Sequence, residues 1–272
     1  MPYSCVNISN IMTMEALNRA RMHSENQDPT KQRAIKDAMA LLVEAKVTDP
    51  GQKTEVPLVV EQPSLNLLDQ AVNEFKDNPH TPESVNRFWQ TFLETSIKSR
   101  GLDIPVPIVS CDRTQEELEA LGKEGKMWVP ETKLTYSQLG KIFPETKSYA
   151  LREDSPIKDE YEQDAKGVDV EVSIESPNRE TTENDLRELF KSQNRKGMRL
   201  STYILASQES KLLAGQYFDE GDTWSRLLGS RDGGHVVDAG SYVDGFLVVG
   251  WSLDPRGHDS DWGGRSEGVK KA

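Results

Sequence analysis

The sequence is poor in cysteine and in long apolar runs. Only two of its 272 residues are cysteine, Cys5 and Cys111, and neither belongs to a C-x-x-C pair. Small secreted domains that depend on disulfides carry more cysteine than this. No window approaches the ~18 consecutive apolar residues of a membrane-spanning helix. The first residues lack the basic and apolar segments of a secretory signal. We therefore expect a reduced, cytoplasmic protein without a membrane partner.

Positive charge is scarce as well. The chain has 33 Lys and Arg against 45 Asp and Glu, which gives a net charge of -12. The excess is uneven, because Glu153 to Glu188 holds 13 acidic and 4 basic residues. Proteins bind nucleic acid chiefly by neutralising phosphates with basic side chains. This balance therefore predicts no nucleic-acid partner.

The motifs of common cofactor and metal sites are absent. The sequence contains neither G-x-x-x-x-G-K-[ST] nor G-x-G-x-x-G, the two glycine-rich phosphate loops. Its four histidines form no H-x-H or H-E-x-x-H pair. Asp259 and Asp261 resemble the start of a calcium loop, but Lys270 stands where that loop needs a bidentate glutamate. We therefore expect no cofactor and assign no metal ligand.

One segment near the C-terminus matches a catalytic motif. Residues 264–268 read Gly-Arg-Ser-Glu-Gly and fit G-x-S-x-G, the nucleophile elbow of α/β-hydrolases. That motif needs a preceding strand, and an acid and a histidine later in the chain. Neither requirement is met around Ser266. We interpret the segment as a glycine-rich tail and assign no catalytic residue.

The first 150 residues show the periodicity of helices. Apolar residues recur every three to four positions in three stretches, which is typical of amphipathic helices. These stretches cover residues 28–42, 65–75 and 82–97. Thr81-Pro82 is a good helix start, since a capping threonine precedes a proline at the first helical position. The second and third stretches should form a helical hairpin.

Residues 102–150 show a mixed pattern. Thr114 and Thr135 are placed to cap short helices, and Met127 to Val129 reads as a short strand. Residues 104–109 contain two prolines, so they form an edge strand or no strand. This region extends the helical part as a small α/β addition.

The remaining chain shows the pattern of strands. Residues 151–167 lack apolar periodicity and are interpreted as an acidic linker. Apolar residues alternate from Val168 to Ile174, residues 200–206 read as a second strand, and Thr182 should cap a helix between them. Glycine-containing turns separate apolar runs over 224–251, which predicts a β-meander. Residues 254–272 have too few large apolar side chains to form a core element.

These patterns predict an α+β protein. We expect a mostly helical domain over residues 1–150 and a linker over 151–167. An antiparallel sheet domain with one or two helices should follow over 168–272.

Tryptophan and arginine gather in the last part of the chain. Three of the five tryptophans, Trp224, Trp251 and Trp262, fall in the last 49 residues. Tryptophan and arginine are enriched at binding hot spots, and Trp262 either folds onto the sheet as a cap or is exposed to a partner. The candidate binding residues are Trp262, Arg256, Arg265, His258, Asp259 and Asp261. This pattern favours a non-catalytic protein that recognises a protein or a small molecule.

A second hypothesis is a hydrolase or transferase that uses acid–base groups, with or without a metal. Its candidates fall around predicted turns, where sites often lie. They are Asp219, Glu220, Asp222, His235 and His258. Convergence of these histidines with two carboxylates in one pocket would favour this enzyme.

Overall fold

The computed structural model describes residues 63–146, 148–162, 165–221, 223–242, 245–251 and 255–270. All of them belong to one unit, Glu61–Ala272. Its helices are α3 (Pro63–Asp77), α4 (Pro82–Lys98), α5 (Gln115–Lys123), α6 (Tyr136–Ile142), α7 (Glu183–Ser192) and α8 (Leu200–Ala214). Two 3₁₀ turns are η1 (Pro144–Thr146) and η2 (Tyr149–Leu151). The helix expected at residues 28–42 lies outside the described residues.

The described strands form two sheets. They are β1 (Lys126–Pro130), β2 (Ile157–Asp159), β3 (Gly167–Glu171), β4 (Lys196–Gly197), β5 (Trp224–Asp232), β6 (His235–Ser241), β7 (Leu247–Trp251), β8 (Trp262–Gly264) and β9 (Ser266–Gly268). The first sheet has the antiparallel order β1-β3-β9-β4. The second has the antiparallel order β2-β5-β6-β7, and β8 pairs with β5 in parallel. The predicted meander β5-β6-β7 and the α+β class are confirmed.

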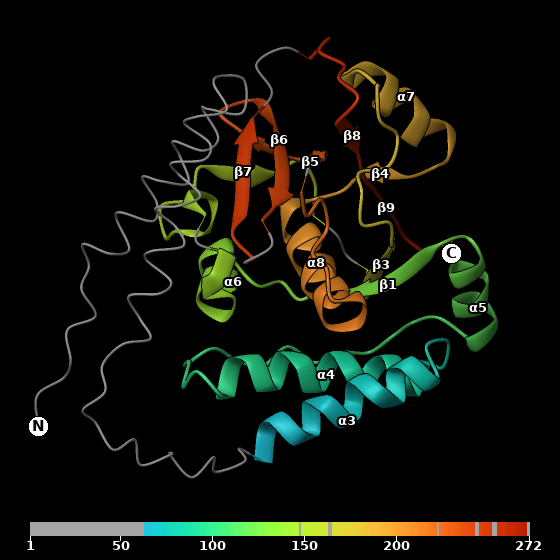
Figure 1. Cartoon of the computed structure of the whole chain (residues 1–272), viewed down its shortest axis with the longest axis vertical. Helices are drawn as coiled ribbons and strands as arrows, with labels where there is room; N and C mark the ends of the chain where they lie inside the picture. The colour runs from blue at the N-terminus through green and yellow to red at the C-terminus, as the bar shows by residue number, and fades with distance from the viewer. Residues whose placement is uncertain are drawn as a thin grey trace, which may run out of the picture. The chain divides into compact units, whose positions relative to one another are not determined.

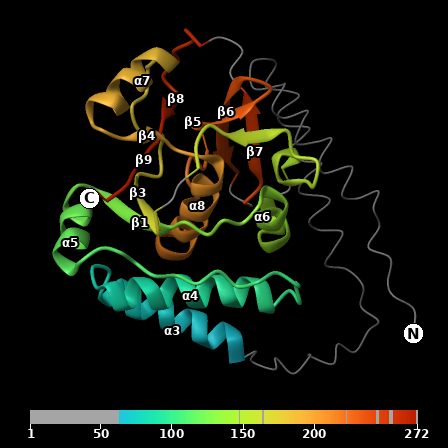
Figure 2. The same cartoon turned by 180° about the vertical axis from the view of Figure 1, so that it is seen from behind.

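The predicted helical hairpin is confirmed as α3 and α4, which lie side by side in Figures 1 and 2. Thr81 caps α4 by accepting a hydrogen bond from the Ser84 amide at 3.4 Å, and Pro82 is its first residue. Phe75 of α3 stacks on Phe88 of α4, with ring centroids 4.8 Å apart. The apolar stripes of the two helices therefore face each other, as their spacing predicts.

Short helices begin where capping residues predict them. Thr114, Thr135 and Thr182 are the N-caps of α5, α6 and α7, and each forms a reciprocal capping box. Such a box satisfies two otherwise unpaired amides at the helix start. Residues 104–109 form no strand. Their two prolines had left an edge strand or no strand as the alternatives, and the second is the one observed.

The strand predicted at residues 200–206 is wrong, because these residues begin helix α8. Ten of its fifteen residues are buried, from Leu200 and Thr202 through Ser210. A helix buried on all sides has no polar face, so its sequence shows no helical period. The apolar run Tyr203 to Ala206 therefore resembles a strand in the sequence alone.

Two segments expected outside the core contribute strands to the sheets. The expected linker, 151–167, contains β2, which pairs with β5. The expected tail contains β8 and β9, and β9 lies between β3 and β4. All residues from 263 to 268 are buried. Strands made of glycine, serine and paired charges lack the large apolar side chains by which core strands are recognised.

Helix α8 is the centre of this unit. It contacts β1 of the first sheet, β5 of the second, and the helices α3 and α6. Figures 1 and 2 show it above the α3–α4 pair and between the two sheets. One hydrophobic core joins residues of α4, α8 and strands of both sheets.

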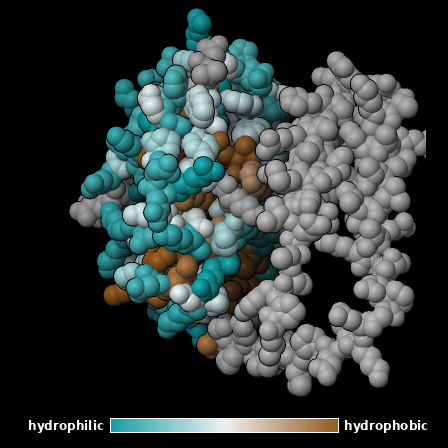
Figure 3. Space-filling model, turned by 90° about the vertical axis from the view of Figure 1, so that its left-hand side faces the viewer, coloured by the Kyte–Doolittle hydropathy of each residue, from teal (hydrophilic) through white to brown (hydrophobic). Residues whose placement is uncertain are grey.

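The surface seen in Figure 3 is mainly hydrophilic, with hydrophobic residues in separate groups. Among the described residues, no helix combines the length and the apolar character that crossing a membrane requires.

Candidate functional site: a cavity around Glu209

Trp262 packs on the second sheet. It is the register partner of Trp224 in the parallel pair β5–β8, and the two rings stack with centroids 6.4 Å apart. The guanidinium carbon of Arg226 lies 5.2 Å from the Trp262 ring. Trp262 is half-buried by these contacts. Trp262 therefore folds onto the edge of the sheet as a cap. This was the first alternative, and exposure to a partner was the second.

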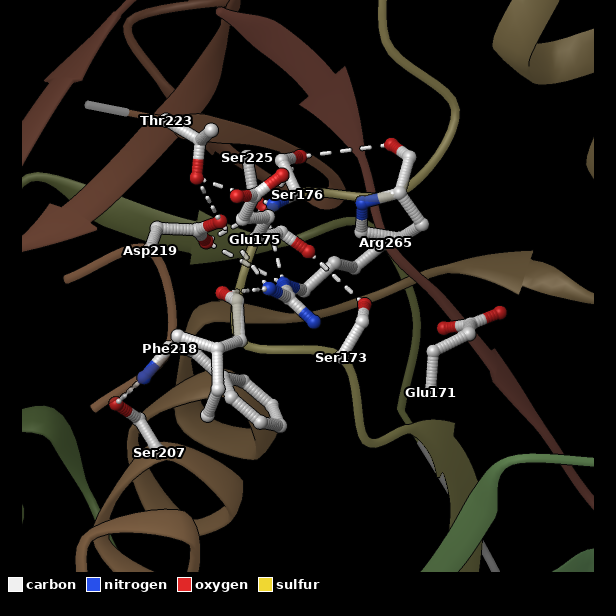
Figure 4. Close-up of polar contacts among 12 residues, drawn as sticks. Glu171, Ser173, Glu175, Ser176, Ser207, Phe218, Asp219, Thr223, Ser225 and Arg265 are labelled. Carbon is white, nitrogen blue, oxygen red and sulfur yellow. Dashed lines mark hydrogen bonds and ion pairs between the residues drawn. The ribbon is translucent and has the colours of Figure 1, made fainter. Parts of the chain in front are cut away.

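Arg265 lies in the interior, although the sequence indicated a binding residue. It is fully buried and forms an ion pair with Asp219, with Nη2 3.1 Å from Oδ1. It also donates to Ser225 Oγ at 2.9 Å and to the Ile174 carbonyl at 2.9 Å, and its guanidinium lies over the Phe218 ring (Figure 4). A side chain held in this way is inaccessible to a partner. Arg265, which lies between β8 and β9, therefore connects these two strands to Asp219, Ser225 and Ile174 in the rest of the fold.

Asp219 is the acceptor at the centre of this network. It follows α8 in a left-handed backbone conformation, with φ of 52°. Besides Arg265, it accepts hydrogen bonds from Tyr203 at 3.0 Å, Thr223 at 3.0 Å and Ser225 at 2.7 Å. Buried polar groups that are fully hydrogen-bonded specify one packing arrangement. Asp219 therefore has a structural role, and its buried carboxylate is not accessible to a substrate.

The other four predicted binding residues lie at the surface. Arg256, His258, Asp259 and Asp261 are exposed, on the segment that leads into β8. The main chain of this segment is held in place, since the Asp261 carbonyl accepts from the Trp224 amide at 2.8 Å. Exposed charges on a loop are ordinary in proteins. None of these four residues lines the cavity described below.

The acid–base residues of the enzyme hypothesis do not meet in one place. Asp219 pairs with Arg265, and Glu220 pairs with Lys211 at 3.3 Å. His235 and His258 are exposed, and position 222 lies outside the described residues. Within the described part of the chain, no group of three or more His, Cys, Asp or Glu could hold a metal.

The G-x-S-x-G segment forms no nucleophile elbow. Ser266 is fully buried in β9, donates to Glu171 at 2.6 Å, and accepts from Arg195 at 2.5 Å. A nucleophile elbow exposes its serine at the end of a sheet. Ser266 is therefore a structural residue.

A cavity of about 340 Å³ lies where α8 meets the helical hairpin, α5 and β1. This is within the range of about 300–1,000 Å³ typical of small-molecule sites. Its walls are mostly apolar and include Phe75, Leu118, Trp128 and Phe218. Gly122 of α5 permits this packing, because a Cβ there would overlap the His80 ring, which also lines the cavity. Residues far apart in the sequence thus enclose one space.

Glu209 of α8 lines this cavity and is fully buried. Neither of its carboxyl oxygens has a hydrogen-bond partner among the described residues. An unpaired buried polar group costs about 1–3 kcal/mol, and a charged one costs more. Such groups in native proteins call for a specific explanation, often functional.

The electrostatics of the cavity follow from this burial. Loss of hydration raises the pKa of Glu209 well above its ordinary value. Lys126 also lines the cavity, but its Nζ is 2.8 Å from Glu124 Oε2. Strongly perturbed carboxyls in a cavity are candidates for functional sites. The cavity therefore has mainly apolar walls, and Glu209, whose carboxyl tends to hold a proton, is one of its lining residues.

Sequence reasoning missed Glu209 because residues 200–206 were interpreted as a strand. If the whole stretch is taken as a helix, Leu205, Glu209 and Leu213 fall at four-residue spacing on one face. An acidic residue on an apolar helix face is uncommon in a folded core. The position of Glu209 on this apolar face was the feature of the sequence that could have indicated a buried functional carboxyl.

Three comparisons were made with known proteins, and they found no matching family, curated protein or solved structure.

Proposed function

We propose that this protein is a binding protein for a small, mainly apolar molecule, and that the cavity around Glu209 is its site. The observation that carries the proposal is a largely apolar cavity of about 340 Å³ that is lined by Glu209, whose buried carboxyl has no hydrogen-bond partner among the described residues. Ligand sites typically combine apolar walls with a few polar groups that orient the ligand. This proposal keeps the ligand recognition indicated by the sequence and moves it away from Trp262.

The walls support binding of an apolar body. Phe75, Leu118 and Trp128 are buried side chains that would contact a ligand. Burial of apolar surface contributes about 25 cal/mol per Å² removed from water. These three side chains belong to α3, α5 and β1, so the surface that they offer lies on regular secondary structure.

The proposal predicts that filling the cavity abolishes binding. Leu121 is a half-buried residue of α5 that lines it, so Leu121→Trp should place an indole ring in the space. We expect the neutral dye N-phenyl-1-naphthylamine to fluoresce on binding to the native protein. Its affinity should fall by about tenfold or more in the variant, equivalent to about 1.4 kcal/mol. A fluorescence titration measures this.

Leu189→Trp is the matched control. Leu189 is half-buried in α7 and packs against a separate hydrophobic cluster. The Leu189→Trp variant should bind the dye as tightly as the native protein does. Equal loss of affinity in both variants, or no dye binding by the native protein, would contradict the cavity as the binding site.

A further inference from the structure

We propose that the cavity selects ligands with a protonated amine, whose ammonium group pairs with the Glu209 carboxylate while the apolar part fills the space. This inference rests on the proposed function and specifies the ligand class of that site. Its basis is the fully buried Glu209 carboxyl, whose two oxygens have no hydrogen-bond partner among the described residues, on a residue that lines the largely apolar cavity.

Charge complementarity favours an ammonium group over other head groups. An ammonium carries three N–H donors and no acceptor, whereas an ionised carboxylate only accepts. The two therefore satisfy each other, and hydrogen bonds between opposite charges are about twice as strong as neutral ones. A hydroxyl supplies one donor and no charge. Of these two head groups, only the ammonium supplies both the donors and the charge that an ionised Glu209 requires.

The remaining charged groups at the cavity do not replace the ligand's cation. Lys126 is paired with Glu124, and no ion pair or hydrogen bond between His80 and Glu209 is found among the described residues. An anionic head group would face Glu209 without a compensating cation in contact. A divalent metal would need several oxygen ligands, and the side chains that line the cavity are mainly apolar.

Binding of this kind is coupled to proton release. Because burial holds the proton on Glu209, an ammonium ligand must displace it to form the ion pair. The amine remains protonated up to about pH 10, as lysine does. The observed affinity should therefore rise by up to tenfold per pH unit while the pH is below the pKa of Glu209. His80 also lines the cavity, so His80→Asn tests whether its imidazole contributes to this pH dependence.

The experiment compares three probes of one length on the full chain: hexylamine, 1-hexanol and hexanoate. Each displaces the dye from the native protein and from Glu209→Gln at several pH values between 5 and 8. We expect hexylamine to bind at least tenfold more tightly than 1-hexanol to the native protein. Calorimetry in buffers of different ionisation enthalpy should show one proton released per hexylamine. Because the proton is released from Glu209, His80→Asn should still release one proton per hexylamine bound.

Glu209→Gln should remove the preference and the proton release while the dye still binds. Equal binding of hexylamine and 1-hexanol to the native protein, or tighter binding of hexanoate, would overturn the ammonium assignment and leave the cavity as a site. An unchanged preference in Glu209→Gln would overturn it as well. Absence of dye binding would instead overturn the proposed function itself.

Discussion

Replacing Arg265 with methionine is expected to lower the free energy of unfolding by about 3–5 kcal/mol, the usual cost of removing one partner of a buried ion pair. Arg265 is fully buried and pairs with Asp219, so Arg265→Met leaves the Asp219 carboxylate in the interior without its cation. The hydrogen bonds to Ser225 and Ile174 are lost at the same time. Urea unfolding measures the effect as a lower midpoint at an unchanged slope.

Arg256→Met is the matched control, because Arg256 is exposed in the same C-terminal segment. Its effect should stay within about 1 kcal/mol, as for most surface charges. Adding Asp219→Asn to Arg265→Met should restore part of the lost stability, since no unpaired charge then remains. Equal, small effects of Arg265→Met and Arg256→Met would contradict the interior position of β8–β9.

The second large effect concerns Glu209 and pH. A carboxyl whose pKa is raised by folding binds more protons in the native state than in the unfolded state. Stability is therefore lost as the pH rises above the ordinary pKa of glutamate and towards the pKa of the folded protein. Glu209→Gln removes this loss. As the pH rises, the free energy of unfolding of the variant should therefore increase relative to that of the native protein by up to about 1.4 kcal/mol per pH unit. Urea unfolding between pH 5 and 8 measures the difference.

Asp238 adds a pH dependence of the same sign to both proteins. Burial raises its pKa to about 7, although Arg226 across the strand pair opposes this. The difference between Glu209→Gln and the native protein cancels this contribution. Glu188→Gln, at an exposed position of α7, should leave the pH profile unchanged. Parallel profiles of the native protein and Glu209→Gln would show that Glu209 is not buried as a neutral acid.

Local features of the sequence were sufficient for much of the fold. Thr81, Thr114, Thr135 and Thr182 each begin a helix where their capping pattern predicts one. The turn at residues 232–234 joins β5 and β6 as expected. Such signals act within a few residues, so they do not depend on the rest of the chain.

The parts that could not be predicted depend on contacts between distant residues. Arg265 and Asp219 are 46 positions apart, and only the fold makes them a buried pair. Asp169, a polar position within the alternating stretch from Val168 to Ile174, is buried and pairs with both Arg113 and Arg195. Pairing with a distant residue makes burial of a charge possible, and a pattern of polar and apolar residues carries no information about such partners.

The cavity was beyond sequence reasoning for the same reason. Its walls come from five separate elements, and Glu209 enters it from a helix without an apolar period. Of the candidate residues chosen from composition, Trp262 instead stacks on Trp224 within the second sheet, and Arg265 forms a buried ion pair with Asp219.

A crystal structure of the full chain with hexylamine tests the binding site most directly. We expect the alkyl chain to lie between Leu118, Trp128 and Phe218, with its nitrogen about 2.7–3.2 Å from a Glu209 carboxyl oxygen. The same crystals of Glu209→Gln should lack this contact. A cavity filled by its own side chains, or ordered water on Glu209 with hexylamine excluded at saturating concentration, would contradict it.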